Sequence, residues 1–308
     1  MIRKLVKQGA ATMMISLPAR WIKFNQLGKG DEINLEEKEN EIRVTTGKID
    51  KKKKEIILKM NPKLKENLRH ALLHIYRRDF DKIIIENVNT EILKKLRKIT
   101  SLMLGFEITD TSKNICIIEN ISEPTENKYD IILKKMFIII SDNIDSIIKD
   151  FKTNKYSNKD EIFEMKDQGD RFYVFCKRIL TKMGLDRKAI LEWEFLTYIN
   201  AIHHELVYMY MYASKTKPKI DEEIAPLLEE FKKYFMLLKD AYEKKDTNIV
   251  FDIIDQRHKY HYGKCFDLLE KSKDGSTVIL AFIREIFRLV HLSTSPIKSM
   301  IYDKSGHQ

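Results

Sequence analysis

The chain has 308 residues, of which 56 are Lys or Arg and 46 are Asp or Glu, so its formal net charge is +10 at neutral pH. This length exceeds that of one small module and predicts two or three domains with a sizeable core. The basic excess favours polyanionic partners, either nucleic acid or an anionic membrane surface. No signal peptide is evident, and apolar runs such as Met136–Ile140 are far shorter than a membrane span. We therefore expect a cytoplasmic protein without membrane insertion.

The three cysteines, Cys116, Cys176 and Cys265, are widely separated and lie in apolar patterns. Their spacing matches neither a disulfide framework nor a metal site. We expect buried free thiols in a reducing compartment.

The first fifty residues predict two short strands around Gly9, one short helix, and two further strands at Glu32–Glu37 and Glu41–Thr45, with a turn at 38–40. Pro18 suits the first helical position, because its φ is fixed and that position needs no amide donor. Leu17, which precedes the proline, is held extended and ends the preceding strand.

Four features of this segment carry a resemblance to a known family: Val6-x-x-Gly9, Ser16-Leu17-Pro18, Trp21 and Leu27-Gly28-Lys29-Gly30-Asp31. In order and spacing they resemble the swapped-hairpin DNA-binding domain of the AbrB/SpoVT/MazE group, over residues 1–48. The resemblance implies that hairpins of two subunits interleave to form a homodimer, with the basic residues of both copies on one face. Independently, about fifty residues with so few large apolar side chains cannot bury enough surface alone. The alternative is a small structural β-hairpin cap.

Six basic side chains of this segment are the candidates for DNA contact: Arg3, Lys4, Lys7, Arg20, Lys23 and Lys29. Each of them could equally be a solvated surface charge, because Lys and Arg are mostly exposed whatever their role. Their clustering favours DNA binding. The run Lys51–Lys54 is typical of a solvated linker, with phosphate contact beside the first domain as the second interpretation.

Residues 55–122 alternate between strand and helix periodicity and predict a small α/β domain. Its predicted strands are Glu55–Met60, Lys82–Glu86, Phe106–Thr109 and Ile115–Ile118, and its predicted helices are Pro62–Arg77 and Thr90–Leu104. Gly105 is its only glycine, which argues against a glycine-rich nucleotide site. A connecting or dimer-supporting role is the interpretation that remains.

Residues 125–308 predict an all-α domain of two successive three-helix bundles, so the whole chain is expected to be a multi-domain α+β protein. The six predicted helices are Lys128–Lys152, Asn158–Met183, Ala189–Ser214, Asp221–Lys244, Thr247–Lys271 and Ser276–Tyr302. Asn158 and Glu161 have the spacing of a capping box at the start of the second helix.

This helical half, and the segment Asp167-Gln168-Gly169-Asp170-Arg171-Phe172-Tyr173, resemble a PhoU domain, whose second helix carries an acidic Asp-Arg-aromatic segment. Together with the first domain, the chain resembles archaeal regulators that join an AbrB-like head to a PhoU domain. The resemblance implies a role in phosphate homeostasis, usually as a negative regulator of uptake. It also implies a protein partner such as a phosphate transporter ATPase or a signalling kinase.

PhoU helices typically carry an acidic residue and, four positions later, an aspartate, which together can hold a cation. This chain departs from that pattern, since the positions concerned hold Lys166 and Asp170, Ile199 and His203, and Phe287 and His291. A multinuclear cluster is therefore not expected. Asp170, His203 and His291 are weak candidates for a sparse transition-metal site, and satisfied core histidines are the alternative.

No catalytic grouping stands out from the sequence, and we do not expect an enzyme. His203-His204-Glu205 lacks the four-residue spacing of a zinc protease helix. Asp255, His258 and His261 form a loose stripe that is more typical of surface or interfacial histidines.

Three functions thus compete at this point. The first is a dimeric DNA-binding regulator linked to phosphate. The second is a PhoU-like adaptor that acts through protein contacts and whose N-terminal domain only dimerises. The third is a metal-dependent helical enzyme, against which the missing carboxylates argue.

Overall fold

The structure, a computed structural model, describes residues 2–9, 12–38, 41–46, 53–122, 125, 127–184, 186–273 and 275–305. The predicted turn at 38–40 and the basic run at 51–54 lie partly outside these residues. The protein is of the mixed α+β class, with a small β region first and a helical region last. It divides into two compact units, Met1–Lys53 and Lys54–Gln308, and each is described by itself.

The first unit contains two antiparallel hairpins and one short helix. Its elements are β1 (Val6–Gln8), β2 (Thr12–Met14), α1 (Ala19–Phe24), β3 (Ile33–Lys38) and β4 (Glu41–Thr46). β1 pairs with β2 and β3 with β4, as two separate two-stranded sheets. Pro18 lies one position before the place we predicted, because it is the extended N-cap of α1, where its carbonyl accepts from the amides of Trp21 and Ile22.

No described residue of the first unit is buried. Many apolar side chains of its strands and their flanks are instead largely exposed: Ile2, Leu5, Val6, Met13, Met14, Ile15, Phe24, Leu35 and Ile42. Large apolar surfaces that are left uncovered are typical of interaction sites. As described, one copy of this unit has no closed core.

The second unit begins with a four-stranded sheet covered by short helices. The sheet order is β5 (Glu55–Lys59), β6 (Lys82–Glu86), β8 (Ile115–Asn120), β7 (Phe106–Asp110), and only β5 and β6 are parallel. The helices are α2 (Pro62–Glu66), α3 (Leu68–Arg77) and α4 (Thr90–Thr100).

The structure divides the helix that we predicted over Pro62–Arg77. It breaks between α2 and α3 at Asn67, whose side chain donates to the carbonyl of Lys63, 3.0 Å away. The helix predicted to reach Leu104 ends at Thr100. Gly105 follows with a φ of +82°, a conformation that glycine adopts without steric cost.

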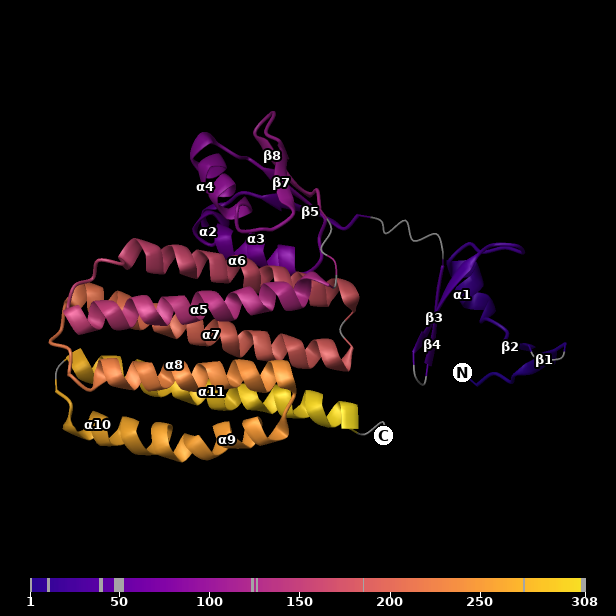
Figure 1. Ribbon diagram of the computed structural model, residues 1–308. Coiled ribbons are helices and arrows are strands. Elements are labelled where there is room, and N and C mark those ends of the chain that lie inside the picture. Colours follow the sequence, from indigo (N-terminus) through magenta and orange to yellow (C-terminus); the bar gives the residue numbers. More distant parts are fainter. Residues whose placement is uncertain are drawn as a thin grey trace. The chain divides into compact units, whose positions relative to one another are not determined.

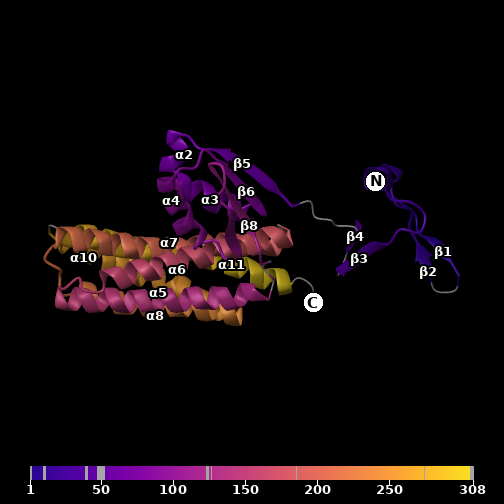
Figure 2. The same cartoon turned by 90° about the horizontal axis from the view of Figure 1, so that it is seen from above.

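Long helices make up the rest of the second unit and lie side by side (Figures 1 and 2). They are α5 (Lys128–Thr153), α6 (Lys159–Met183), α7 (Arg187–Thr216), α8 (Ile224–Lys244), α9 (Thr247–Arg257), α10 (Cys265–Lys271) and α11 (Gly275–Ser305). α5, α6 and α7 contact one another, as do α8, α9 and α11, while α7 packs along α11 and α5 along α8. A π-helical segment, η1 (His258–Lys264), interrupts the fifth helix that we predicted as continuous.

The predicted capping box of the second helix is not formed. Asn158 makes no side-chain cap; its amide and its Nδ2 both donate to Asp150, at 3.1 and 2.9 Å. Asp150 is completely buried and also accepts from the hydroxyl of Tyr210, 2.6 Å away. This carboxylate therefore fastens the turn between α5 and α6 to α7.

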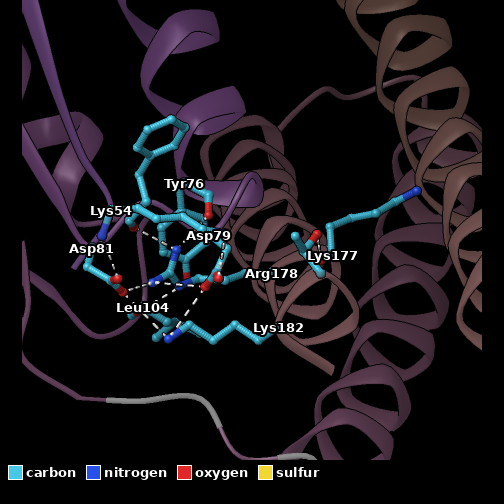
Figure 3. A network of polar contacts seen from close by, with 10 residues as sticks. Lys54, Tyr76, Asp79, Asp81, Leu104, Lys177, Arg178 and Lys182 are labelled. Carbon is cyan, nitrogen blue, oxygen red and sulfur yellow. Dashed lines mark hydrogen bonds and ion pairs between the residues drawn. The ribbon is translucent and has the colours of Figure 1, made fainter. Parts of the chain in front are cut away.

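An ionic network joins the sheet part to α6 (Figure 3). The Arg178 guanidinium, completely buried, donates to the carbonyls of Tyr76 and Phe80, both at 2.9 Å, and to Asp81 at 3.1 Å. Lys182 lies 3.5 Å from Asp79 and 3.6 Å from Asp81. The parts predicted as domains 55–122 and 125–308 thus lie in one compact unit.

The three cysteines are free and buried, as the sequence predicted. Cys116 lies on β8, Cys176 on α6 and Cys265 at the start of α10. Burial raises the pKa of Cys116 to about 11 and that of Cys265 to about 12. Along the described residues, no helix combines the length and the apolar character that a membrane crossing requires.

Candidate functional sites

The six predicted DNA-contacting side chains all lie exposed in the first unit. Arg20 and Lys23 are three residues apart on α1 and therefore occupy neighbouring positions of one helix face. Lys7 lies on β1 opposite Met13, and Arg3 and Lys4 precede that strand. None of the six has a carboxylate within 4.0 Å in the part of the chain that the structure describes.

The charge of this segment is one-sided, because its first thirty residues contain these six basic residues and no Asp or Glu. The first acidic residue, Asp31, is engaged in a turn, where its Oδ2 accepts from the amide of Gly28 at 2.8 Å. Gly30, with a φ of +93°, completes that turn. Asp31 is thus occupied by the backbone of the glycine turn and does not pair with Lys29.

Asp170 lies in a polar cluster, but the histidine that contacts it is His204 and not the predicted His203. Asp170 is bonded to His204 Nε2 at 2.6 Å and to Lys166 and Arg69, both at 2.7 Å. His203 instead bonds Asn143 through its Nε2, at 2.9 Å. Arg69 comes from α3, so sequence spacing offered no indication of it.

Charge and burial set the protonation states in this cluster. Burial alone would raise the pKa of Asp170, but the hydrogen bonds from His204 and Lys166 outweigh it and hold that pKa well below its usual range. Burial lowers the pKa of His203 to about 3, so this imidazole is neutral at physiological pH. Gly169 permits its position, since a Cβ at this residue would lie 2.5 Å from His203 Nδ1.

His291 belongs to a third environment, where its Nε2 lies 3.1 Å from Arg257 Nη1. The three weak metal candidates, Asp170, His203 and His291, therefore have three different partners. Among the described residues, no group of three His, Cys, Asp or Glu side chains is arranged to hold a metal ion.

Arginine and histidine side chains gather around η1, a feature that the sequence pattern did not reveal. Of the stripe predicted to be at a surface or an interface, His258 is exposed but His261 is buried. Gly263 permits the widened π turn, since a Cβ there would come within 2.9 Å of the His258 carbonyl.

The polar clusters of the second unit combine acids, bases and buried neutral imidazoles. They lie at helix contacts, and their groups are bonded mainly to one another. The first unit, in contrast, presents its cations to solvent. Comparison with protein-family models, with curated proteins and with solved structures gave no match for this chain.

Proposed function

We propose that the protein is a dimeric, DNA-binding transcriptional regulator linked to phosphate homeostasis, acting as a negative regulator of phosphate uptake. One observation carries the DNA-binding part of this proposal. The first unit combines exposed cations that lack carboxylate partners with apolar strands that lack cover, among its described residues.

The uncovered apolar side chains support the dimer. Val6 and Met14 are cross-strand partners in the first hairpin, and they are 55% and 43% exposed. DNA presents phosphates and sugar edges and would not cover such side chains, whereas a second copy offers the same apolar surface in a two-fold arrangement. The interleaved hairpins of the AbrB/SpoVT/MazE group are one way to close such a core.

The unpaired cations support DNA as the ligand of the dimer. Arg and Lys side chains that neutralise phosphates release condensed counterions, which favours binding without any base contact. Duplication by two-fold symmetry doubles the cations of one copy and matches the repeated phosphates of a duplex. A segment of this length with no acidic side chain before Asp31 has little charge repulsion towards DNA.

The phosphate link rests on the PhoU-like organisation of the helical half. The starting residues of its helices indicate an internal repeat. The spacing from the start of α6 at Lys159 to the start of α7 at Arg187 equals the spacing from the start of α9 at Thr247 to the start of α11 at Gly275. The same shift aligns Asp167-Gln168 with Asp255-Gln256. This repeat supports the interpretation of the helical half as two related three-helix groups. The proposed class of partner is a phosphate transporter ATPase or a signalling kinase.

A salt titration of duplex DNA binding, followed by fluorescence anisotropy, tests the proposal. For the double variant Arg3→Gln/Arg20→Gln we expect weaker binding and a shallower log–log salt slope, by about 0.9 for each phosphate that is no longer neutralised. Lys271→Gln, which removes an exposed charge from α10, is the matched control and should leave the slope unchanged. A dimer that binds no duplex would instead indicate the adaptor function.

A further inference from the structure

The π-helical segment η1 is held in an environment rich in arginine and histidine. π-turns are rare and occur frequently at functional sites. η1 packs against α11, which supplies Arg284, Arg288 and His291, and α9 ends at Arg257 directly before it. The partners of these cations decide what the cluster can bind.

Arg257 contacts two imidazoles. Its Nη1 lies 3.1 Å from His291 Nε2, and its Nη2 lies 3.4 Å from His258 Nε2. A guanidinium can only donate, so the Nε2 atom of His291 accepts and this ring is neutral. The proton of His291 is therefore on Nδ1.

Arg284 repeats this arrangement with His261. The Arg284 carbonyl accepts from His261 Nδ1 at 3.2 Å, and Arg284 Nη2 donates to His261 Nε2 at 3.3 Å. Arg288 differs from both, because Glu285 binds it through two hydrogen bonds of 2.8 and 2.6 Å. Among the described residues, neither Arg257 nor Arg284 has a carboxylate within 4.0 Å.

Three buried N–H donors of the cluster lack an acceptor in the part of the chain that the structure describes: Arg257 Nε, Arg284 Nε and His291 Nδ1. Leaving a buried donor without an acceptor is costly, and it is more costly for a charged group. Two of these donors belong to positively charged guanidinium groups, and the third belongs to a neutral imidazole. A ligand that satisfies them brings acceptor atoms, and negative charge favours its binding beside two guanidinium groups.

We propose that the cluster formed by Arg257, Arg284 and His291 beside η1 binds a phosphate group, either free or as a small phosphate monoester. Tetrahedral oxyanions accept hydrogen bonds in several directions, and the planar guanidinium suits them better than a point charge does. Two guanidinium groups without a described carboxylate within 4.0 Å disfavour a metal cation as the ligand.

The equivalent positions in α6 and α7 explain why the first group of helices lacks such a site. The shift that aligns His203 with His291 also aligns Asp170 with His258. Asp170 neutralises the cations around it, as its bonds to Arg69 and Lys166 show. At His258 that carboxylate is missing, and the neighbouring Arg257 keeps its charge.

Isothermal titration of the full-length chain with inorganic phosphate, in chloride buffer without DNA, tests this site. We expect one phosphate per chain, and a loss of affinity of at least about tenfold in Arg257→Gln and in Arg284→Gln. Lys271→Gln should bind as the wild type does. Because DNA is absent, the result is independent of the proposed DNA binding.

A parallel titration with glycerol phosphate distinguishes the two sources of the group. Tighter binding of the ester indicates an organic phosphate, and tighter binding of inorganic phosphate indicates the free anion. If the Gln variants do not fold, the thermal midpoint of the wild type decides, since phosphate should raise it more than chloride of equal ionic strength. Absence of both heat and midpoint shift with either phosphate, or unchanged affinity in a folded Arg257→Gln/Arg284→Gln variant, overturns the proposal.

Discussion

Lys177 and Arg178 are consecutive residues of α6, and both side chains are completely buried. Figure 3 shows that they point away from each other. Arg178 keeps its charge among Asp79, Asp81 and two carbonyls. Lys177 has only neutral partners, with its Nζ 2.6 Å from the Trp193 carbonyl, 2.7 Å from Thr197 Oγ1 and 3.9 Å from the centroid of the Trp193 ring.

These different surroundings predict that Lys177 makes stability depend on pH. Burial, with a smaller contribution from Arg77, lowers the pKa of Lys177 to about 6. The same lysine in the unfolded chain titrates near pH 10.4, so between these values the unfolded state binds a proton that the folded state lacks. The free energy of unfolding should therefore rise with pH over this range, by at most about 1.4 kcal/mol per pH unit from this group.

Urea denaturation of wild type and Lys177→Met at about pH 7 and about pH 9 measures this effect. The variant should lose this part of the rise, and the exposed Lys271→Met should keep it. Equal pH dependence in wild type and Lys177→Met would show that Lys177 is charged in the folded protein.

At the scale of elements, the network around Arg178 fixes the sheet part on α6. Arg178 reaches the end of α3 through the Tyr76 carbonyl and the start of β6 through Phe80 and Asp81. Its guanidinium also lies 4.8 Å from the centroid of the Phe106 ring on β7. One side chain thus contacts three elements of the sheet part.

Arg178→Met should destabilise the protein by about 3–5 kcal/mol, because it leaves buried carbonyls without a donor and Asp81 without its closest cation. Lys182→Met is the control, since Lys182 lies near the same two carboxylates but farther from Asp81, at 3.6 Å against 3.1 Å for Arg178, and its effect should be smaller. Chemical denaturation followed by circular dichroism measures both. Equal costs for the two variants would contradict the central role of Arg178.

The long helices were predictable because their apolar residues recur with helical period over many turns. The predicted Lys128–Lys152 and the observed Lys128–Thr153 differ by one residue. The break at Asn67 and the π segment at 258–264 were not predictable, because local hydrogen bonds and the packing of Gly263 decide them rather than periodicity.

The polar sites were predictable only in part, for a related reason. Asp170 was identified from its motif, but whether His203 or His204 faces it depends on the rotation of α7 about its axis. Two adjacent helical residues point about 100° apart, since 3.6 residues make one turn. The contact of Arg69 with Asp170 could not be predicted, because Arg69 is distant in sequence and the contact forms only when α3 packs on α6.

At the scale of the whole molecule, the exposed hairpins predict a homodimer through the first unit. Val6→Glu/Met14→Glu places charges on side chains that are exposed within one copy. In a monomer these changes would have little effect, whereas in a dimer they would lie in the closed core. We expect light scattering to show a shift from dimer towards monomer.

Ile138→Glu is the matched control for this variant, because Ile138 is also 56% exposed but lies on α5. It should leave the molecular mass unchanged. A wild-type chain that is monomeric at micromolar concentration would exclude the dimer.

Alkylation of the three buried thiols can measure how readily different parts of the second unit unfold locally in the native chain. Only a thiolate reacts with an alkylating reagent, and burial both shields these sulfurs and raises their pKa. Each cysteine must therefore become exposed by local or global opening before it is labelled. Mass spectrometry of the alkylated chain would then report separately on the β-sheet through Cys116, on α6 through Cys176 and on the segment after the π turn through Cys265, without any engineered probe.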